Sequence, residues 1–366
     1  MKFTFDRDAM IKEISIAQEI ITNKSPISIL SNILLIAQNN TLIIKASDTS
    51  VNFISHIPVE IQEEGTTTIY CDKFMAILAS SPSGEIEFNQ EDIKVIIKPL
   101  TKRRNFQLKS IASEKFPEIQ EAIDVPFFDI SSKDLKNMIR QTIFSVSVDA
   151  NRYFMNGVFF EKKNNQFIMV STDARRLSYI GKDVEIPDFS SSIVPVKILN
   201  CILKNAPEEG NVSLAIVDKV IFVKFGNYEF SSKLIDGQFP NYQKVIPETQ
   251  TNNFTVNKSD LDSALKSVGI MLDKKVSRII FKISPDNLTI YSPESDLGTA
   301  EETIPCKYQG EDIQIALNYN YLTDPIKVIE SDDLIFEFTD VNKAITLRPE
   351  PAQDYFHIIM PMSITN

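Results

Sequence analysis

The sequence predicts an α+β protein built from three copies of one domain. One opening pattern, a short alternating strand, a polar turn and an amphipathic helix, occurs three times, at residues 3–10, 128–139 and 254–261. Phe5, Ile130 and Val256 are equivalent in these openings and lie 125 and 126 residues apart, a period that indicates repeated domains rather than a solenoid. Alternating strand-length segments follow each opening, which favours antiparallel sheets with helices on one face. We therefore expect three domains, at residues 1–122, 126–247 and 253–366.

The middle opening shows how each element is recognised. Phe128 and Ile130 alternate with polar residues, which is the period of a strand. Ser131 or Ser132 can then cap a helix, because a serine hydroxyl accepts hydrogen bonds from free amides of the first turn. The helix has one apolar face, formed by Leu135, Met138 and Ile139.

The first copy continues with seven predicted strands, at residues 33–36, 42–44, 51–59, 66–69, 86–88, 93–98 and 105–110. Its second helix is expected at residues 72–79, where Pro82 and Gly84 end the pattern.

The second and third copies keep this order. Asp173 lies 43 residues after Ile130, as Asp48 lies 43 residues after Phe5. Second helices are predicted at residues 196–205 and 319–329, and Pro325 should start or kink the latter. The remaining predicted strands include residues 156–160, 279–282, 288–291, 334–338, 344–347 and a last strand from Tyr355.

Composition limits the class of protein. The 366 residues are 43% hydrophobic and 24% charged, as in ordinary globular proteins, and the apolar run at residues 27–37 is too short to span a bilayer. We therefore expect a cytoplasmic protein, whose widely spaced Cys71, Cys201 and Cys306 are buried thiols. The net charge of −11 argues against a nucleic-acid partner when it is taken alone.

Catalytic patterns are missing from the sequence. It has two histidines, His56 and His357, ten glycines, and no Walker, G-x-S-x-G or G-x-G-x-x-G motif. Asp48 and Asp173 either cap turns after strands or, in an alternative hypothesis, serve a metal-dependent hydrolase. We favour turn capping and expect no enzyme activity, no metal site and no cofactor.

Several segments carry a resemblance that covers the whole chain. They are residues 1–4, 26–32, 152–157 (Arg-Tyr-Phe-Met-Asn-Gly), 172–177 (Thr-Asp-Ala-Arg-Arg-Leu), 233–242 (Lys-Leu-Ile-Asp-Gly-Gln-Phe-Pro-Asn-Tyr) and 360–362 (Met-Pro-Met). With these segments and the triple repeat, the chain resembles the bacterial sliding clamps, the beta subunits of DNA polymerase III holoenzyme.

The resemblance implies a function. Two chains would close head to tail into a homodimeric ring, with helices inside and sheets outside, around duplex DNA of any sequence. The ring would tether the DNA polymerase III alpha subunit, and would bind the clamp loader, other polymerases and repair proteins through short linear motifs. Encirclement needs only a mildly basic lining, so an acidic protein is compatible with it. The alternative is a dimeric repeat scaffold that holds only protein.

The resemblance also implies which residues contact DNA. Lys24 and the loop with Asp149, Arg152, Tyr153 and Phe154 match positions where family members touch DNA, although Phe154 replaces a tyrosine. Further cations on the middle helices could line the ring or simply be solvated; they are Lys133, Lys136, Arg140 and Lys197.

A pocket for partner peptides is implied between the middle and last copies. Its expected residues are Met155, Thr172, Arg175, Arg176, Leu177, Pro240, Lys244, Val245, Asn318, Tyr321, Met360, Pro361 and Met362. Apolar walls with a few polar groups suit a peptide anchored by leucine or phenylalanine. Ordinary core packing is the alternative for Leu177, Val245 and Met360. Ala174-Arg175 replaces the family's usual Gly-His, and Lys244 a commoner arginine.

The ring interface is the third implied site. One side is expected to use Lys73, Phe74, Arg103, Asn105, Phe106 and Leu108, and the other chain Ile270, Leu272, Glu301 and Glu302. A basic edge would thus meet an acidic edge around an apolar centre.

Overall fold

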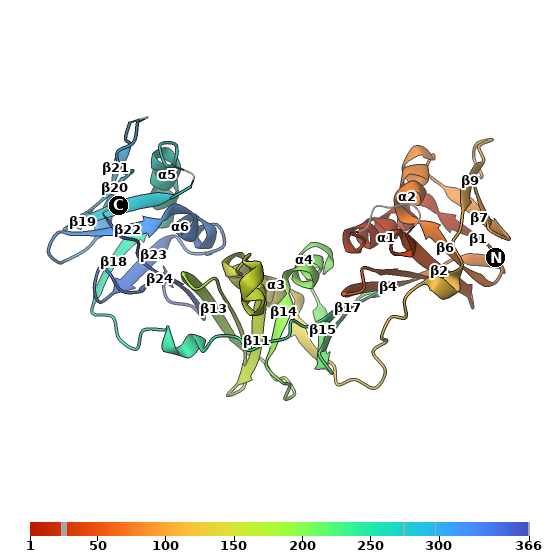
Figure 1. Ribbon diagram of the computed structural model, residues 1–366, viewed down its shortest axis with the longest axis horizontal. Coiled ribbons are helices and arrows are strands. Elements are labelled where there is room, and N and C mark those ends of the chain that lie inside the picture. The colour runs from red at the N-terminus through yellow and green to blue at the C-terminus, as the bar shows by residue number, and fades with distance from the viewer. Residues whose placement is uncertain (23–27, 274, 297, 365–366) are drawn as a thin grey trace. The chain divides into compact units, whose positions relative to one another are not determined.

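The computed structural model describes residues 1–22, 28–273, 275–296 and 298–364. Strands dominate it (Figure 1). Every pairing among the named strands is antiparallel. Six α-helices accompany these strands in the described residues, two for each predicted copy. The predicted α+β class with antiparallel sheets is confirmed. None of the helices in the described ranges is long and apolar enough to cross a membrane.

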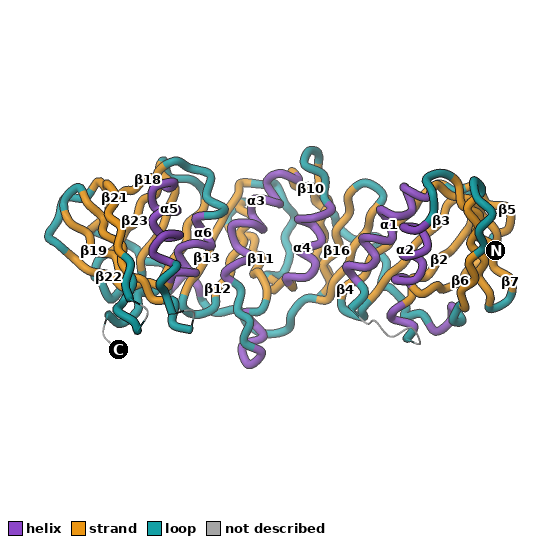
Figure 2. Tube along the Cα trace, turned by 90° about the horizontal axis from the view of Figure 1, so that it is seen from above, coloured by secondary structure: helices purple, strands orange, loops and turns teal. Residues whose placement is uncertain are grey.

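The first repeat contains two helices, α1 (Arg7–Ile20) and α2 (Cys71–Ser80). Asp6 begins α1 by accepting a hydrogen bond from the backbone of Ala9 at 2.8 Å. The two helices pack against each other, and α1 also packs on β3 and β4 (Figure 2). The strands are β1 (Lys2–Asp6), β2 (Asn32–Gln38), β3 (Thr41–Ser47), β4 (Val51–Pro58), β5 (Glu60–Glu63), β6 (Gly65–Tyr70), β7 (Glu85–Glu91), β8 (Lys94–Pro99) and β9 (Phe106–Lys109).

The second repeat contains α3 (Ser132–Thr142) and α4 (Val196–Asn205). The hydroxyl of Ser132 donates to the carbonyl of Pro207, across the loop that follows α4. The strands are β10 (Phe128–Ser131), β11 (Gly157–Lys163), β12 (Gln166–Thr172), β13 (Arg176–Asp183), β14 (Ser192–Pro195), β15 (Asn211–Val217), β16 (Val220–Phe225) and β17 (Tyr228–Lys233).

The third repeat contains α5 (Lys258–Gly269) and α6 (Tyr319–Ile326). Asn257 caps α5 at the position that Asp6 occupies in the first repeat. The prediction that Pro325 starts α6 is wrong, because Pro325 lies in the last turn and the helix ends one residue later. A kink at Pro325 stays a prediction. The strands are β18 (Asn252–Asn257), β19 (Arg278–Ser284), β20 (Asn287–Tyr291), β21 (Glu301–Lys307), β22 (Ile313–Asn318), β23 (Asp333–Phe338), β24 (Ile345–Glu350) and β25 (Tyr355–Ile359).

Sheets continue from one repeat into the next. In the eight-stranded sheet β17 of the second repeat pairs with β4 of the first, and we call this pairing the first junction. In the twelve-stranded sheet β13 of the second repeat pairs with β25 of the third, which we call the second junction. Strand order makes β4, β13 and β21 equivalent, and likewise β9, β17 and β25.

Contacts divide the chain into two compact units, each with its own core. One unit comprises Met1–Lys133 and Lys197–Leu234, and the other comprises Asp134–Val196 and Ile235–Asn366. The second repeat therefore contributes to both units, because each half of it shares a sheet with a neighbouring repeat. The domain boundaries expected from the sequence stay a prediction.

Candidate functional site

A tight turn at the start of β13 carries several of the predicted pocket residues. Asp173 Oδ1 accepts hydrogen bonds from the backbone of Arg175 at 2.9 Å and of Arg176 at 3.0 Å. Thr172 Oγ1 accepts from the backbone of Ala174 at 3.1 Å and donates to the carbonyl of Arg176 at 2.6 Å. The prediction that Asp173 caps a turn is therefore confirmed.

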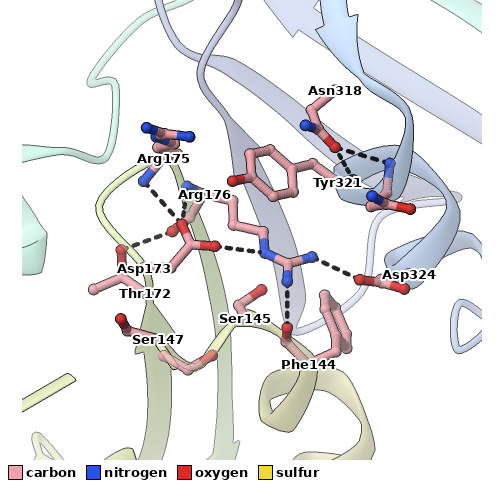
Figure 3. Close-up of polar contacts among 12 residues, drawn as sticks. Phe144, Ser145, Ser147, Thr172, Asp173, Arg175, Arg176, Asn318, Tyr321 and Asp324 are labelled. Atoms are coloured by element: carbon pink, nitrogen blue, oxygen red, sulfur yellow. Dashed lines mark hydrogen bonds and ion pairs between the residues drawn. The ribbon is translucent and has the colours of Figure 1, made fainter. Parts of the chain in front are cut away.

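The side chain of Arg176 links this turn to the third repeat (Figure 3). Its Nε lies 3.1 Å from Asp173 Oδ2, and its Nη1 donates to Asp324 Oδ2 of α6 at 2.8 Å. Its Nη2 donates to the carbonyl of Phe144 at 2.6 Å, and the guanidinium lies 4.6 Å from the ring centre of Tyr321. With 12% of the side chain exposed, every donor group of this guanidinium faces a protein acceptor or ring.

The walls of the predicted pocket come from three segments. The backbone of Met360 donates to the carbonyl of Arg175 at 2.9 Å, which holds the chain end beside the turn. Met362 donates in the same way to Ala316 of β22 at 2.8 Å, and Pro361 lies between them, half-buried. Asn318 accepts from the backbone of Asn320 at 2.9 Å and of Tyr321 at 3.4 Å, which begins α6. The structure thus brings the turn, the start of α6 and the chain end together.

The floor is an apolar cluster that sequence reasoning found only in part. Leu177 was expected there, but most members were not: Ile168, Val170, Ile193, Phe239, Tyr242, Phe356 and Ile358. Ile168 and Val170 on β12, like Phe356 and Ile358 on β25, lie two positions apart and so share a face of the sheet. Their neighbours on these strands are buried too, so apolar alternation did not single them out. Met155 is buried, Pro240 is half-buried, and Lys244 and Val245 are exposed beside Tyr242. Burial and the hydrogen bond to Glu161 raise the pKa of Tyr242.

A buried polar chain lies behind the turn. Ser145 Oγ and Ser178 Oγ are 2.6 Å apart, and Ser178 Oγ is 3.0 Å from Nδ1 of His357. His357 is buried on β25, and its Nε2 has no hydrogen-bond partner. Burial, and then the nearby charge of Arg176, lower the pKa of His357 to about 3, so the imidazole is neutral.

The loop expected to contact DNA precedes β11. Asp149 Oδ1 accepts from the backbone of Asn151 at 2.9 Å, and its Oδ2 lies 3.6 Å from Nε of Arg152. Tyr153 is about half exposed, and Phe154 packs against the apolar cluster of the pocket floor. The Cβ of any residue replacing Gly237 would lie 3.0 Å from Phe154, so the loop packs closely here.

Two of the expected helix cations are not free. Lys136 is 2% exposed, so the expectation that it lines an open surface is wrong. Lys197 Nζ donates to Asp48 Oδ2 at 2.5 Å and to the carbonyl of Ile20 at 2.6 Å. Helix periodicity alone revealed neither the burial of Lys136 nor the ion pair of Lys197, whose side chain is 29% exposed, so a DNA contact of Lys197 stays a prediction. Lys133 and Arg140 are exposed, and Lys24 lies outside the described residues.

The predicted interface residues lie on two strands, on the segments beside them and on α2. The edge strand β9 carries Phe106 and Leu108, both half-buried, and Arg103 and Asn105 precede it, exposed. In the other unit Glu301 and Glu302 open β21, while Ile270 is 80% exposed and Leu272 is half-buried after α5. Phe74 is a correction: it is fully buried against Phe5 and Phe88, because it faces the core side of α2, whereas Lys73 is exposed.

The turn at Asp48 repeats the turn at Asp173. Asp48 Oδ1 accepts from the backbone of Ser50 at 2.9 Å and of Val51 at 2.7 Å. Burial would raise the pKa of Asp48, but the hydrogen bonds from Lys197, Val51 and Ser50 outweigh it and hold that pKa below its usual value. No group of three or more His, Cys, Asp or Glu that could hold a metal ion occurs among the residues that the structure describes.

Family models match almost the whole chain. The N-terminal, central and C-terminal domains of the DNA polymerase III beta subunit match residues 1–120, 129–241 and 243–363, respectively. The beta sliding clamp of Treponema pallidum is 44% identical over 368 residues, which cover 99% of each chain. The beta sliding clamp of Pseudomonas aeruginosa is 27% identical and covers 100% of both chains.

Solved structures show the same similarity. The sliding clamp of Pseudomonas aeruginosa bound to griselimycin is similar with a TM-score of 0.94, 27% identity and full coverage of both chains. That of Bartonella birtlesii, also bound to griselimycin, is similar with a TM-score of 0.93, 25% identity and full coverage of both.

Proposed function

The chain belongs to the DNA polymerase III beta subunit family, the bacterial sliding clamps, and we propose that two copies close head to tail into a ring around duplex DNA. It is a non-catalytic processivity factor of DNA synthesis. The proposal includes binding of the polymerase and other DNA-processing proteins at the second junction, and action in the cytoplasm, where bacterial DNA is replicated.

Unpaired strand edges are the observation that supports the ring. At the two junctions a strand of the β4 type pairs with a strand of the β9 type, β4 with β17 and β13 with β25. The strands left over are β9, at the end of its sheet, and β21, which pairs with β18 only at Cys306 and Lys307. Pairing β9 with the partner's β21 would form a third junction of the same kind, between two chains. A two-fold axis would make two such contacts and close the ring.

The register of the junctions predicts the contacts across this interface. Tyr228 lies opposite Ser55 at the first junction, and Tyr355 opposite Ile180 at the second. With the same antiparallel pairing, β9 would run against the partner's β21, which would bring Asn105 and Phe106 close to the partner's Glu301 and Glu302. The basic residues beside β9, Lys102, Arg103 and Arg104, would then face this acidic strand.

DNA contact is proposed for the exposed cations and the loop before β11. Arg152 and Tyr153 are exposed on a loop that is closely packed at its base, and Lys133 and Arg140 are exposed on α3. Such groups contact phosphates without reading sequence. A topological link does not require tight binding, so it is compatible with a net charge of −11.

The pocket at the second junction is proposed to take short motifs. Its floor is apolar, and its rim carries the exposed Val245 and Met360, which are 45% and 37% exposed. Arg175 and Lys244 add exposed cations at the rim. An extended peptide with leucine or phenylalanine anchors would cover the apolar side chains, while rim groups would fix its orientation.

Retention on DNA tests the ring directly. The protein is loaded by the clamp loader of the same organism onto nicked circular DNA, separated from free protein by gel filtration, and the circle is then cut. We expect co-elution with the circle and loss from the linear product, because only a ring is held by topology. The protein should have a mass near twice 41.5 kDa by light scattering.

Matched variants sharpen this test. Leu108→Asp should give the monomer mass and no retention, since it places a charge in the proposed contact. Ile123→Asp is the control, because Ile123 is exposed outside β9 and should leave mass and retention unchanged. Persistence on linear DNA, or a dimer that survives Leu108→Asp, would contradict the proposal.

A further inference from the structure

The first junction contains a second copy of the pocket backbone. Ser47 Oγ accepts from the backbone of Thr49 at 3.0 Å, as Thr172 Oγ1 accepts from Ala174 at 3.1 Å. The φ angles of Thr49 and Ala174 are 76° and 73°. The backbone of Lys233 donates to the carbonyl of Ser50 at 3.0 Å, as Met360 donates to Arg175 at 2.9 Å. The turn, the strand pairing and the segment that follows the paired strand therefore have the same backbone structure at the two junctions.

Space is also present at the first junction. A cavity of about 310 Å³ lies there, and its lining includes Ser47, Thr49, Asn52, Pro117, Ser231 and Lys233. Pro117 corresponds to the pocket residue Pro240, since each follows a phenylalanine that closes its repeat. The first junction therefore has both the backbone structure and the space that a peptide would need.

The side chains are what differ. Strand registers align five members of the apolar floor with five residues of the first junction. In place of Val170, Leu177, Ile193, Phe356 and Ile358 the first junction has Lys45, Asn52, Thr68, Glu229 and Ser231. The cross-strand pair Leu177 and Ile358 thus becomes the pair Asn52 and Ser231.

Four of these five polar side chains have hydrogen-bond or ion-pair partners at the first junction. Asn52 Nδ2 donates to Ser231 Oγ at 3.0 Å, and Ser47 Oγ donates to Asn52 Oδ1 at 2.6 Å. Lys45 Nζ donates to Glu121 at 2.9 Å, and Glu229 lies 3.1 Å from Lys224 Nζ. A leucine or phenylalanine entering here would bury these groups without water and displace some of their partners, which weakens binding by about tenfold or more for each group left unpaired.

We propose that these polar side chains, and not the backbone, restrict motif binding to one pocket in each chain. The first junction is a structural copy of the pocket whose polar lining excludes apolar anchors. This inference deepens the proposed function and rests on it, because it requires the second junction to bind motifs. It identifies Asn52, Ser231 and their neighbours as residues that determine where a partner docks.

Grafting the apolar lining tests the inference. The variant Lys45→Val/Asn52→Leu/Glu229→Phe/Ser231→Ile/Lys233→Met gives the first junction four of the five aligned floor side chains of the second, together with the equivalent of Met360; the fully buried Thr68 is left unchanged. The probe is a synthetic peptide that carries the clamp-binding motif of the same organism's polymerase III alpha subunit, titrated by calorimetry against the full dimer. We expect one peptide per wild-type chain and two per grafted chain. One peptide per folded grafted chain would overturn the inference.

A reciprocal variant keeps the test decisive if the graft does not fold. Leu177→Asn/Ile358→Ser installs the polar pair at the second junction, where both groups can bond to each other. Peptide affinity should fall at least about tenfold while the dimer mass is unchanged. Unchanged affinity would overturn the inference. If the wild-type chain binds no peptide, the proposed pocket fails instead, so the two failures are distinguishable.

Discussion

The two junctions have the same turn but satisfy its aspartate differently. At the first junction Asp48 pairs with Lys197, which comes from α4 of the second repeat. At the second junction Asp173 pairs with Arg176 of its own turn, and Arg176 extends the pair to Asp324 of α6. The backbone bonds to each aspartate are equivalent. The comparison shows that both repeats keep the aspartate that accepts the backbone hydrogen bonds of the turn, while the ion pairs of this aspartate differ.

The largest expected difference concerns the arginine. Arg176→Ala should lower the free energy of unfolding by about 3 kcal/mol, because Asp173, Asp324 and the carbonyl of Phe144 lose a largely buried partner. Lys197→Ala, the matched change at the first junction, should cost about 1.5 kcal/mol, since Asp48 keeps two backbone bonds. Urea unfolding followed by circular dichroism measures both. Equal losses would mean that the two networks are energetically equivalent.

The pH response should also differ, because the second junction buries a histidine where the first has Phe230. The pKa of His357 is about 3 in the folded protein against 6.5 for the free side chain, so the unfolded chain binds more protons between these values. Above pH 6.5 the neutral imidazole costs the folded protein nothing. As the pH falls below 6.5, the free energy of unfolding decreases, by about 2 kcal/mol at pH 5.

Replacing His357 by phenylalanine, the residue type at the equivalent position of the first junction, isolates the contribution of His357 to the pH response. His357→Phe should remove the part of the stability change between pH 7 and pH 5 that belongs to this side chain, as measured by thermal unfolding at both values. Phe230→Leu is the control, since it is buried at the equivalent position and carries no proton. An identical pH response in wild type and His357→Phe would show that His357 does not titrate on unfolding.

The smallest expected effects concern the strained residue of each turn. Thr49 and Ala174 have φ angles of 76° and 73°, which favour glycine. Thr49→Gly and Ala174→Gly should each raise the free energy of unfolding by about 0.5–1 kcal/mol, with the larger gain at Thr49 because it is β-branched. Ser50→Gly is the control at ordinary φ and should destabilise slightly. A loss of stability in either glycine variant would mean that the replaced side chain contributes more than the strain costs.

The sequence identified one side of the pocket better than the other. Arg176 and Tyr321 were predicted from the resemblance and contact each other, and the predicted Met360 bonds to the backbone of the predicted Arg175. Asp324 and Phe144 were missed, because their contacts with Arg176 join residues 148 and 32 positions apart. Lys136 was misassigned because helix spacing does not tell which neighbour covers a side chain. Phe74 was misassigned because the resemblance placed in the interface a residue that the structure buries in the core.

The sequence by itself determined the repeated architecture of this protein. Strand alternation, turn residues and the period of about 125 residues are local properties, so they can be read before folding. Only the tertiary structure decided which strands join the repeats, that Lys197 pairs with Asp48, and that Asn52 and Ser231 occupy the places of Leu177 and Ile358. Those facts depend on pairings between residues more than 140 positions apart, whose geometry is fixed only when the sheets assemble.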